Sequence, residues 1–155
     1  MAKMRIYLDN CTYNRPFDDQ SRIRISLEAQ AKMYIQHLIT GKEIHLVYSY
    51  MSVYENSENP NHEHRKSIFN FFQNAIEFID IDKANIIETH ADALKKWNIK
   101  SNDAIHIACA IEGKCDHFIT TDDGILKKYR ASDIRVCNPI DFISEVDNAQ
   151  YRSNS

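Results

Sequence analysis

The sequence of 155 residues predicts an α/β fold of three layers, in which a central parallel sheet of about five strands lies between two layers of helices. Short β-branched or aromatic runs alternate with longer segments of helical periodicity along the whole chain. The apolar fraction of 43% and the charged fraction of 26% are ordinary for a globular protein of one domain. Three glycines and three prolines leave little material for linkers between domains.

Five runs are predicted as strands. The first, MRIYLD, covers residues 4–9 and is followed by IHLVYS at 44–49, IEFIDI at 76–81, HFITT at 117–121 and IRVC at 134–137. Parallel neighbours need crossover connections that usually contain a helix, and a helical segment separates each run from the next. The runs therefore fit a sheet built from consecutive βαβ units.

The first long helix follows the polar segment after the first strand. Its predicted cap is one of three residues, Asp18, Asp19 or Ser21. Its predicted buried stripe consists of Ile23, Leu27, Ala31, Tyr34 and Leu38, and Gly41 ends it. Residues 50–59 and 60–75 are expected to form the two helices between the second and third strands.

The helices of the second half are predicted in the same way. Residues 82–97 are amphipathic, with Asp82 as the expected cap. The segment SNDAIHIACAIEG at 101–113 is apolar nearly all round, which predicts a buried helix capped by Ser101 or Asn102. Shorter helices are expected at 122–130 and at 138–146, the latter starting at Pro139.

We expect one domain over residues 1–147 and a disordered tail at 148–155, because the tail is polar and terminal. No apolar run approaches the about 20 residues that span a bilayer, and the N-terminus lacks the apolar core of a signal peptide. The four cysteines form no CxxC pair and are expected to be reduced thiols: Cys11, Cys109, Cys115 and Cys137. A cytoplasmic protein without membrane association is the expectation.

Four carboxylates lie at positions where an acid is costly or where ligands bind: Asp9, Glu55, Asp103 and Asp122. Asp9 and Asp122 follow the first and fourth predicted strands, and ligands of open α/β sheets bind beyond such strand ends. Taken singly, each acid also fits a turn, a helix cap or a solvated helix face. Taken together, they would repel one another unless a cation neutralised them. Oxygen ligands of this kind suit Mg²⁺ or Mn²⁺.

In their order along the chain, these motifs resemble the PIN domain family, which includes RNA-cleaving nucleases and the VapC-type toxins of bacterial toxin–antitoxin pairs. The matching segments are YLDNC, YSYMSVYEN, SNDAIHIACA and FITTDDGILKK, spread from Met4 to about Asp141. The resemblance implies the strand order 3-2-1-4-5. It also implies that one or two Mg²⁺ or Mn²⁺ ions are held by Asp9, Glu55, Asp103 and Asp122. Gly124 stands where many members have a further acid, and Asp123 is the candidate replacement.

The implied activity is divalent-metal-dependent endoribonuclease activity, in which RNA phosphodiester bonds are hydrolysed by a metal-activated water. RNA is the implied substrate, an antitoxin protein is the implied partner if the chain is a toxin, and a homodimer is the default assembly. The candidate substrate contacts are Asn10, Arg15, Thr120, Thr121 and His106. The candidate phosphate contacts are Arg15, Arg22, Arg24, Lys127, Lys128 and Arg130, of which Lys127 and Lys128 also fit a solvated helix face. A satisfied, semi-buried side chain is the alternative for His106.

Two other function classes are compatible with parts of the sequence. A non-catalytic PIN-like scaffold would bind RNA or protein without cleaving it, and the missing acid at Gly124 keeps this alternative open. A phosphatase of the haloacid dehalogenase type also starts on a strand that ends in Asp. That class needs a second Asp two residues later, where this sequence has Cys11, so it ranks below the other two.

Overall fold

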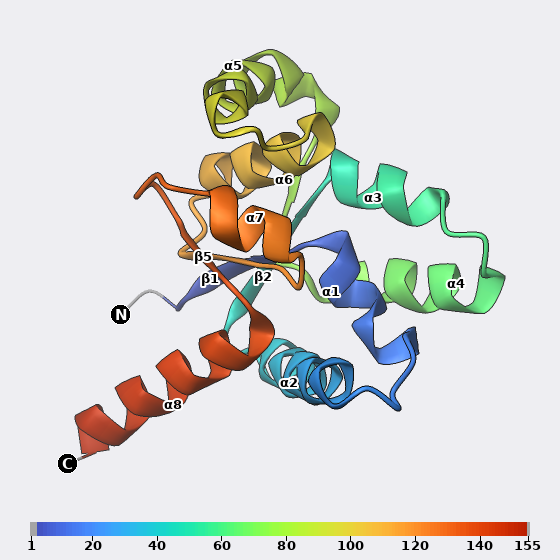
Figure 1. Ribbon diagram of the computed structural model, residues 1–155, viewed down its shortest axis with the longest axis vertical. Helices are drawn as coiled ribbons and strands as arrows, with labels where there is room; N and C mark the ends of the chain where they lie inside the picture. The colour runs from blue at the N-terminus through green and yellow to red at the C-terminus, as the bar shows by residue number, and fades with distance from the viewer. Residues whose placement is uncertain (1–2, 155) are drawn as a thin grey trace.

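A parallel sheet of five strands forms the centre of the molecule (Figure 1), in a computed structural model that describes the backbone of residues 3–154 and the side chains of residues 3–149. The strands are β1 (Arg5–Leu8), β2 (His45–Ser49), β3 (Glu77–Ile79), β4 (His117–Ile119) and β5 (Arg135–Cys137). Their order is β3-β2-β1-β4-β5, and every neighbouring pair is parallel. The predicted fold class and strand order are both confirmed.

The helices are α1 (Asn10–Asn14), α2 (Ile23–Thr40), α3 (Tyr50–Ser57), α4 (His62–Phe71), α5 (Ala84–Leu94), α6 (Ser101–Glu112), α7 (Asp123–Lys128) and α8 (Pro139–Asn154). The sequence did not predict α1 or the 3₁₀ turn at Arg15–Phe17 that follows it. No helix in the described part of the chain is long and apolar enough to cross a membrane.

The C-terminal helix α8 corrects the prediction of a disordered tail for residues 148–154, since all of them belong to this helix. No glycine or proline follows Pro139, so nothing in the local sequence interrupts the helix. Ser155 lies outside the described residues. The single domain over residues 1–147 stays a prediction.

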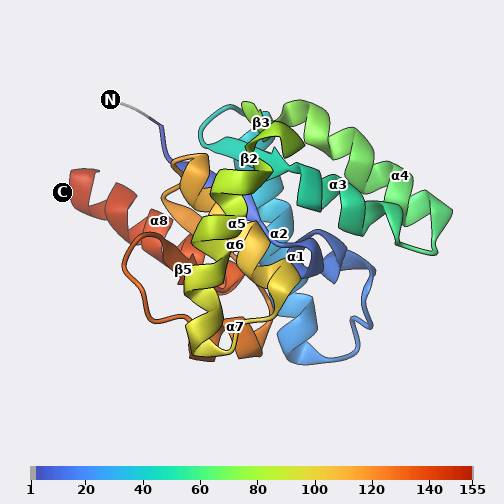
Figure 2. The same cartoon turned by 90° about the horizontal axis from the view of Figure 1, so that it is seen from above.

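Two apolar clusters, one on each face of the sheet, form the core. Successive side chains of a strand point to opposite faces, so Tyr7 of β1 packs in one cluster and its neighbours Ile6 and Leu8 pack in the other. Helices α5 and α6 cover the face of Tyr7, and α2 and α8 cover the opposite face (Figure 1). Helices α3 and α4 extend to one side of the sheet, while α8 extends to the other (Figure 2).

The start of α2 differs from the prediction. The helix begins after Arg22, and no side chain caps it. Asp19 accepts a hydrogen bond from the backbone N–H of Ser21 at 3.0 Å, and Asp18 pairs with Arg15 at 3.0 Å. The polar residues before α2 therefore shape a turn ahead of the helix instead of capping it.

Two other predicted caps are also wrong. Helix α6 begins directly after Lys100, so Ser101 and Asn102 already have helical backbone and lie in the first turn. Before α5, Asp80 accepts a hydrogen bond from the next backbone N–H at 2.7 Å, and Asp82 lies inside the 3₁₀ turn that this bond starts. In each case the chain enters its helix at a different residue from the one that propensity favours.

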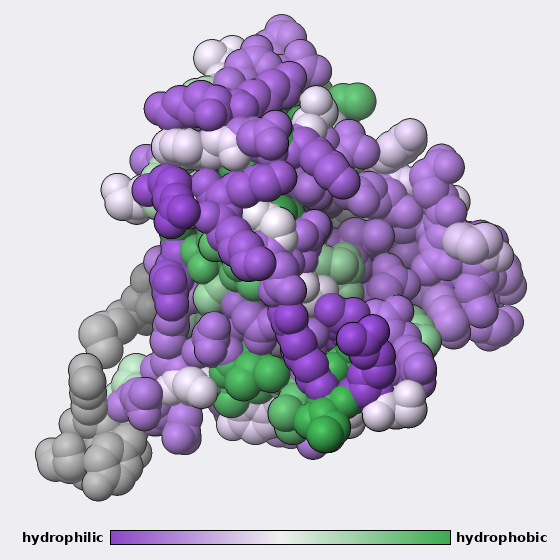
Figure 3. All heavy atoms as spheres, viewed as in Figure 1, coloured by the Kyte–Doolittle hydropathy of each residue, from purple (hydrophilic) through white to green (hydrophobic). Residues whose placement is uncertain are grey.

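The buried face of α2 is rotated relative to the predicted stripe. Ala31 and Leu38 are buried as predicted, but three members of the stripe are exposed: Ile23, Leu27 and Tyr34. An apolar patch over α2 is visible in Figure 3. Two charged residues, Glu28 and Lys32, are buried in their place. Glu28 and Lys32 are in contact with polar or aromatic side chains from other elements. The hydrophobic periodicity of a single helix gives no information about such neighbours.

Replacing Lys32 with methionine is expected to stabilise the protein at neutral pH. The Lys32 ammonium donates to Gln36 Oε1 at 2.7 Å and lies 5.9 Å from the centroid of the Tyr13 ring and 5.5 Å from that of Phe71. Burial lowers the pKa of Lys32 to about 8. Because one pKa unit corresponds to about 1.4 kcal/mol, the buried charge costs roughly 3 kcal/mol at pH 7. The variant loses the hydrogen bond to Gln36, which contributes about 1 kcal/mol, so we expect a net gain of roughly 2 kcal/mol in free energy of unfolding.

The stability effect of Lys32 depends on pH. The folded-state pKa lies below the usual value, so the cost of the charge is fully present below pH 8. That cost disappears as the pH rises from about 8 to about 10.5, and the advantage of the variant should shrink over this window. Urea unfolding at several pH values measures it, with the exposed Lys66→Met as the control. A variant less stable than wild type at pH 7 would contradict the prediction.

Candidate metal centre

The centre of the sheet brings the end of β1 beside the end of β4. Asp9 follows β1 directly, and its backbone N–H donates to the carbonyl of Ile119, the last residue of β4, at 2.9 Å. The Asp9 side chain is buried and accepts a hydrogen bond from the N–H of Asn10 at 2.8 Å, which caps α1. The topological switch point, where ligands of such sheets bind, therefore has a buried carboxylate at its centre.

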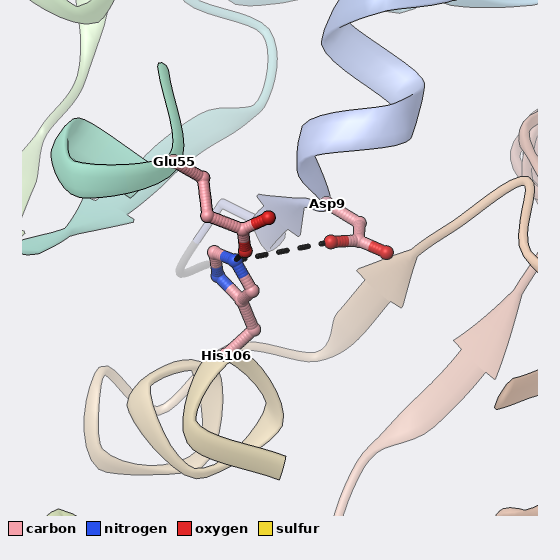
Figure 4. Close-up of side chains that lie close together, drawn as sticks. All are labelled: Asp9, Glu55 and His106. Atoms are coloured by element: carbon pink, nitrogen blue, oxygen red, sulfur yellow. Dashed lines mark hydrogen bonds and ion pairs between the residues drawn. The ribbon is translucent and has the colours of Figure 1, made fainter. Parts of the chain in front are cut away.

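Asp9, Glu55 and His106 converge at this point from three elements (Figure 4). Each residue offers one ligand atom, and these atoms all lie within 4.8 Å of one another. His106 Nε2 is 4.0 Å from Asp9 Oδ1 and contacts Glu55 Oε1 directly. Asp9 and Glu55, two of the predicted metal ligands, lie together here, and His106, a predicted substrate contact, lies directly beside both carboxylates.

A buried hydrogen-bond network holds His106 from behind. His106 Nδ1 is 2.6 Å from the Tyr7 hydroxyl, and this hydroxyl is 2.6 Å from Ser49 Oγ and 3.0 Å from Ser52 Oγ. All four side chains are buried. With Nδ1 engaged by Tyr7, the ring is fixed so that Nε2 faces the carboxylates, which is the usual arrangement for a metal-binding histidine.

The charge state of His106 follows from its surroundings. Burial lowers the pKa of this imidazole, but the hydrogen bond with Glu55 and the nearby Asp9 carboxylate raise it by more, so the net shift is upward. The metal-free site therefore tends to hold a proton on His106, and this proton offsets part of the negative charge of the carboxylates.

Thr120 fixes the Asp9 carboxylate on its other side. The Thr120 hydroxyl donates to Asp9 Oδ2 at 2.8 Å and accepts a hydrogen bond from the backbone N–H of Asp122 at 3.1 Å. Asp122 in turn caps α7 by accepting from the N–H of Gly124 at 2.8 Å. Through its single hydroxyl group, Thr120 thus links Asp9 to Asp122 at the N-terminus of α7.

Asp103 and Asp122 lie beside this group. They line one small pocket of about 130 Å³ together with Lys100 and Lys128. Burial raises the pKa of Asp103 to about 6, and the Asp9 and Asp122 carboxylates add to the effect. The four predicted acids therefore share one electrostatic site, even though only Asp9 and Glu55 belong to the tightest group.

Two residues predicted near the site are held in ion pairs. Both oxygens of Asp123 accept from the guanidinium of Arg24, at 2.7 and 2.5 Å. The Arg15 side chain pairs with Asp18 and with the buried carboxylate of Glu28, at 3.0 Å in each case. A role of Asp123 in metal binding or of Arg15 in substrate binding would require these pairs to open, and both roles stay predictions.

The remaining predicted contacts lie around the Asp9 side chain. Asn10 lines an open groove together with Glu55, whereas Thr121 is buried. The thiol of Cys11 donates to Asp9 Oδ2 at 3.3 Å, and burial raises its pKa to about 12. Cys11 is therefore a neutral support for Asp9 at physiological pH and not a nucleophile.

Sequence reasoning missed Tyr7, Ser49 and Ser52, the residues behind His106. The sequence contained one weak signal for this network: Tyr7 lies in a predicted buried strand, and a buried tyrosine needs a hydrogen-bond partner for its hydroxyl group. Ser49 also caps α3 and forms a capping box with Ser52, so both hydroxyls have ordinary local roles. Only the parallel pairing of β1 with β2 brings these serines to Tyr7.

Fold and site together define a parallel α/β domain with a candidate metal centre at its switch point. The PIN domain family matches residues 6–131, which is most of the chain, so the chain belongs to the PIN domain family. No curated protein sequence matches the chain significantly.

Several solved structures share the fold. A chain of VapBC2 from Rickettsia felis, solved with a DNA fragment from its promoter, has a TM-score of 0.56 and 16% identity, covering 87% of this chain and 98% of that one. FitAcB from Neisseria gonorrhoeae gives a TM-score of 0.55 and 18% identity over 86% and 97% of the two chains. VapBC-1 from nontypeable Haemophilus influenzae gives 0.56 and 17% over 88% and 98%. At these identities the likeness shows a common fold.

Proposed function

We propose that this protein is a divalent-metal-dependent endoribonuclease that hydrolyses RNA phosphodiester bonds. The observation that carries the proposal is the convergence of Asp9, Glu55 and His106 at the switch point of a PIN domain. Asp103 and Asp122 extend the same negative site. We infer that Asp9, Glu55, Asp103 and Asp122 bind the metal, as the sequence motifs imply, and that His106 joins them.

The residues present fit a divalent cation. Burial and neighbouring carboxylates raise the pKa of Asp103, so the metal-free site is short of positive charge. Carboxylate oxygens suit Mg²⁺ and Mn²⁺, and the imidazole nitrogen favours the softer Mn²⁺ of the two. When bound, such an ion lowers the pKa of water and neutralises charge on the phosphate.

The protein's own residues position the reacting groups. Thr120 and the N–H of Asn10 hold the two oxygens of Asp9, and Tyr7 holds His106, so these ligands are oriented in advance. Lys100 and Lys128 line the pocket beside Asp103 and Asp122, where their ammonium groups can contact phosphate oxygens of RNA. We infer that Lys128 is a phosphate contact and not only part of a solvated helix face.

The test of this function is a cleavage assay on a mixed RNA substrate with Mg²⁺, with Mn²⁺ and with EDTA. We expect cleavage by wild type with a divalent ion, no cleavage with EDTA, and loss of cleavage in Asp9→Asn because Asp9 is the centre of the site. If wild type binds RNA but cleaves none of it with either ion, the protein is a non-catalytic scaffold and the proposal fails. Equal cleavage by Asp9→Asn and wild type would exclude the metal site.

We further propose that the ribonuclease is the toxin of a toxin–antitoxin pair. The support is the resemblance of its sequence motifs to VapC-type toxins, together with the fold that it shares with VapBC2, FitAcB and VapBC-1. Induced expression of wild type is expected to arrest bacterial growth, whereas Asp9→Asn should not. Coexpression with a small DNA-binding protein encoded beside the gene should relieve the arrest. If the wild-type protein cleaves RNA in vitro but its expression does not slow growth, the toxin role is rejected and the ribonuclease function is retained. The homodimer stays a prediction that sedimentation can test.

Replacing His106 with glutamine should change the preference between metals. If His106 Nε2 is a ligand, the loss of Mn²⁺ affinity in the variant should exceed the roughly 10–100-fold found for residues that only support a ligand. The loss of Mg²⁺ affinity should be smaller, because nitrogen contributes more to Mn²⁺ binding. Titration calorimetry with each ion measures both affinities. An equal loss for the two ions would mean that His106 only orients Glu55 through their hydrogen bond.

A further inference from the structure

An open groove of about 540 Å³ begins at Glu55 of the candidate metal centre. We call it the amide groove, and it is defined by Asn10, Asn14, Asn59, Asn102, Tyr54 and Glu58. These residues come from α1, the end of α3, the loop after α3 and the first turn of α6. Its volume lies within the about 300–1,000 Å³ of typical ligand sites.

We propose that the amide groove binds one unpaired base of the RNA substrate next to the bond that is cleaved. This inference rests on the proposed function, since it names the part of the substrate that the site selects. Proteins recognise single-stranded RNA by stacking a base on an aromatic ring and by hydrogen bonds to its exposed edges. The amide groove offers both kinds of group.

The amides are ordered before any ligand binds. Asn59 Nδ2 donates to Asn14 Oδ1 at 3.0 Å, and Asn14 Nδ2 donates to the carbonyl of Asn10 at 3.0 Å. The N–H of Asn10 then donates to Asp9 Oδ1 at 2.8 Å. This chain of hydrogen bonds connects the rim of the groove to the candidate metal centre. The amide side chains are already held in place, so they lose little conformational entropy when a base binds.

Tyr54 supplies the aromatic ring. It lies one residue before Glu55 on α3, and 54% of it is exposed although it is a large apolar side chain. An exposed ring beside a catalytic site is a surface on which a base can stack, and stacking tolerates all four bases.

The charges of the groove favour a base over a phosphate. Glu58 lines the groove beside Glu55, and carboxylates repel phosphate but accept hydrogen bonds from N–H groups. Phosphate has its own partners in the separate pocket of Lys100 and Lys128. Among the four bases, guanine presents two adjacent N–H donors on its Watson–Crick edge, which match the two oxygens of one carboxylate. We therefore expect guanine to be preferred.

Neutral nucleosides test the amide groove without cleavage, phosphate or metal. Guanosine, inosine, adenosine, cytidine and uridine are titrated into wild type, and binding is followed by NMR shifts of the protein. We expect guanosine to bind best and inosine, which lacks the exocyclic amino group, to bind more weakly. Tyr54→Ala should weaken guanosine binding about tenfold, and Glu58→Gln should remove the preference for guanosine over inosine.

Matched controls are Tyr34→Ala and Glu63→Gln, which alter exposed residues of the same kinds outside the groove. Sequencing of the RNA ends produced by wild type and Tyr54→Ala supplies the second measurement. If wild type binds guanosine through Tyr54 but cleaves no RNA under any condition, the base site is supported and the ribonuclease function is rejected. The base site is rejected, and the ribonuclease function kept, if wild type cleaves RNA but binds no nucleoside and Tyr54→Ala cleaves at the same positions as wild type.

Discussion

Replacing Asp103 with asparagine is expected to abolish metal-dependent RNA cleavage and, at the same time, to stabilise the metal-free protein. Both effects have one cause. Burial and the carboxylates of Asp9 and Asp122 raise the pKa of Asp103 to about 6, so at neutral pH its negative charge costs free energy that only a cation recovers. Asparagine keeps the size of the side chain but removes the negative charge with which Asp103 would bind the metal under the proposed function.

The expected loss of cleavage exceeds about 100-fold, the upper end for residues that merely support a metal ligand. The metal-free variant should gain roughly 1 kcal/mol in free energy of unfolding at pH 7, a value discounted for the solvent-exposed part of Asp103. Because the folded-state pKa is raised, wild type loses stability as the pH rises from about 4 to about 6, and the advantage of the variant should vanish below pH 4.

Thermal unfolding in EDTA and in Mn²⁺ separates the two effects of this substitution. Mn²⁺ should raise the unfolding temperature of wild type more than that of Asp103→Asn. The exposed Asp133→Asn serves as the control and should change neither stability nor cleavage. A variant that is less stable than wild type in EDTA would show that Asp103 makes favourable contacts which outweigh the repulsion.

Replacing Glu28 with alanine is expected to cause a large loss of stability without touching the metal centre. Glu28 of α2 is fully buried, and its carboxylate lies 3.0 Å from Arg15 Nε and 3.3 Å from Arg24 Nε. It also accepts a hydrogen bond from Asn138, which precedes α8. The variant leaves the half-buried Arg15 without this partner. Breaking a buried pair in this way costs about 3–5 kcal/mol, and we expect the lower end because Arg24 is half exposed.

Urea unfolding measures this loss. Glu28→Gln keeps the shape of the side chain and removes only its charge, so an intermediate loss is expected and would separate charge from packing. Glu43→Ala, at an exposed glutamate, is the matched control and should stay within about 0.5 kcal/mol of wild type. A similarly small change in Glu28→Ala would show that this ion-pair network contributes nothing to stability.

The strands and most helices could be predicted from the sequence because their signals are local. IHLVYS and HFITT are short and rich in β-branched or aromatic residues, and both form strands. The buried face of α2 could not be predicted in the same way. Glu28 and Lys32 point inward because Arg15, Asn138 and aromatic rings from other elements receive them. Hydrophobic periodicity assigns charged residues to the surface and cannot anticipate such partners.

The residues of the candidate site also differ in whether the local sequence could predict their positions. The positions of Asp9 and Asp122 follow from where two strands end, which the sequence reveals once the strand order is known. The place of His106 depends on the packing of α6 against β1 and α3, which brings Tyr7 and Glu55 to its two ring nitrogens. Three elements distant in the sequence must meet for this to happen, and no local pattern encodes their distance.

The sequence by itself therefore determined the order of the elements, the parallel sheet and the carboxylates at its carboxyl edge, because strand and helix periodicity act over a few residues. The tertiary structure alone decided which side chains complete the site. It placed His106, a predicted substrate contact, directly beside the carboxylates of Asp9 and Glu55. It also placed Asp123 and Arg15 in ion pairs and formed a groove lined by amides beside Glu55. These outcomes depend on contacts between segments that are distant in the sequence, and such contacts form only when the whole chain folds.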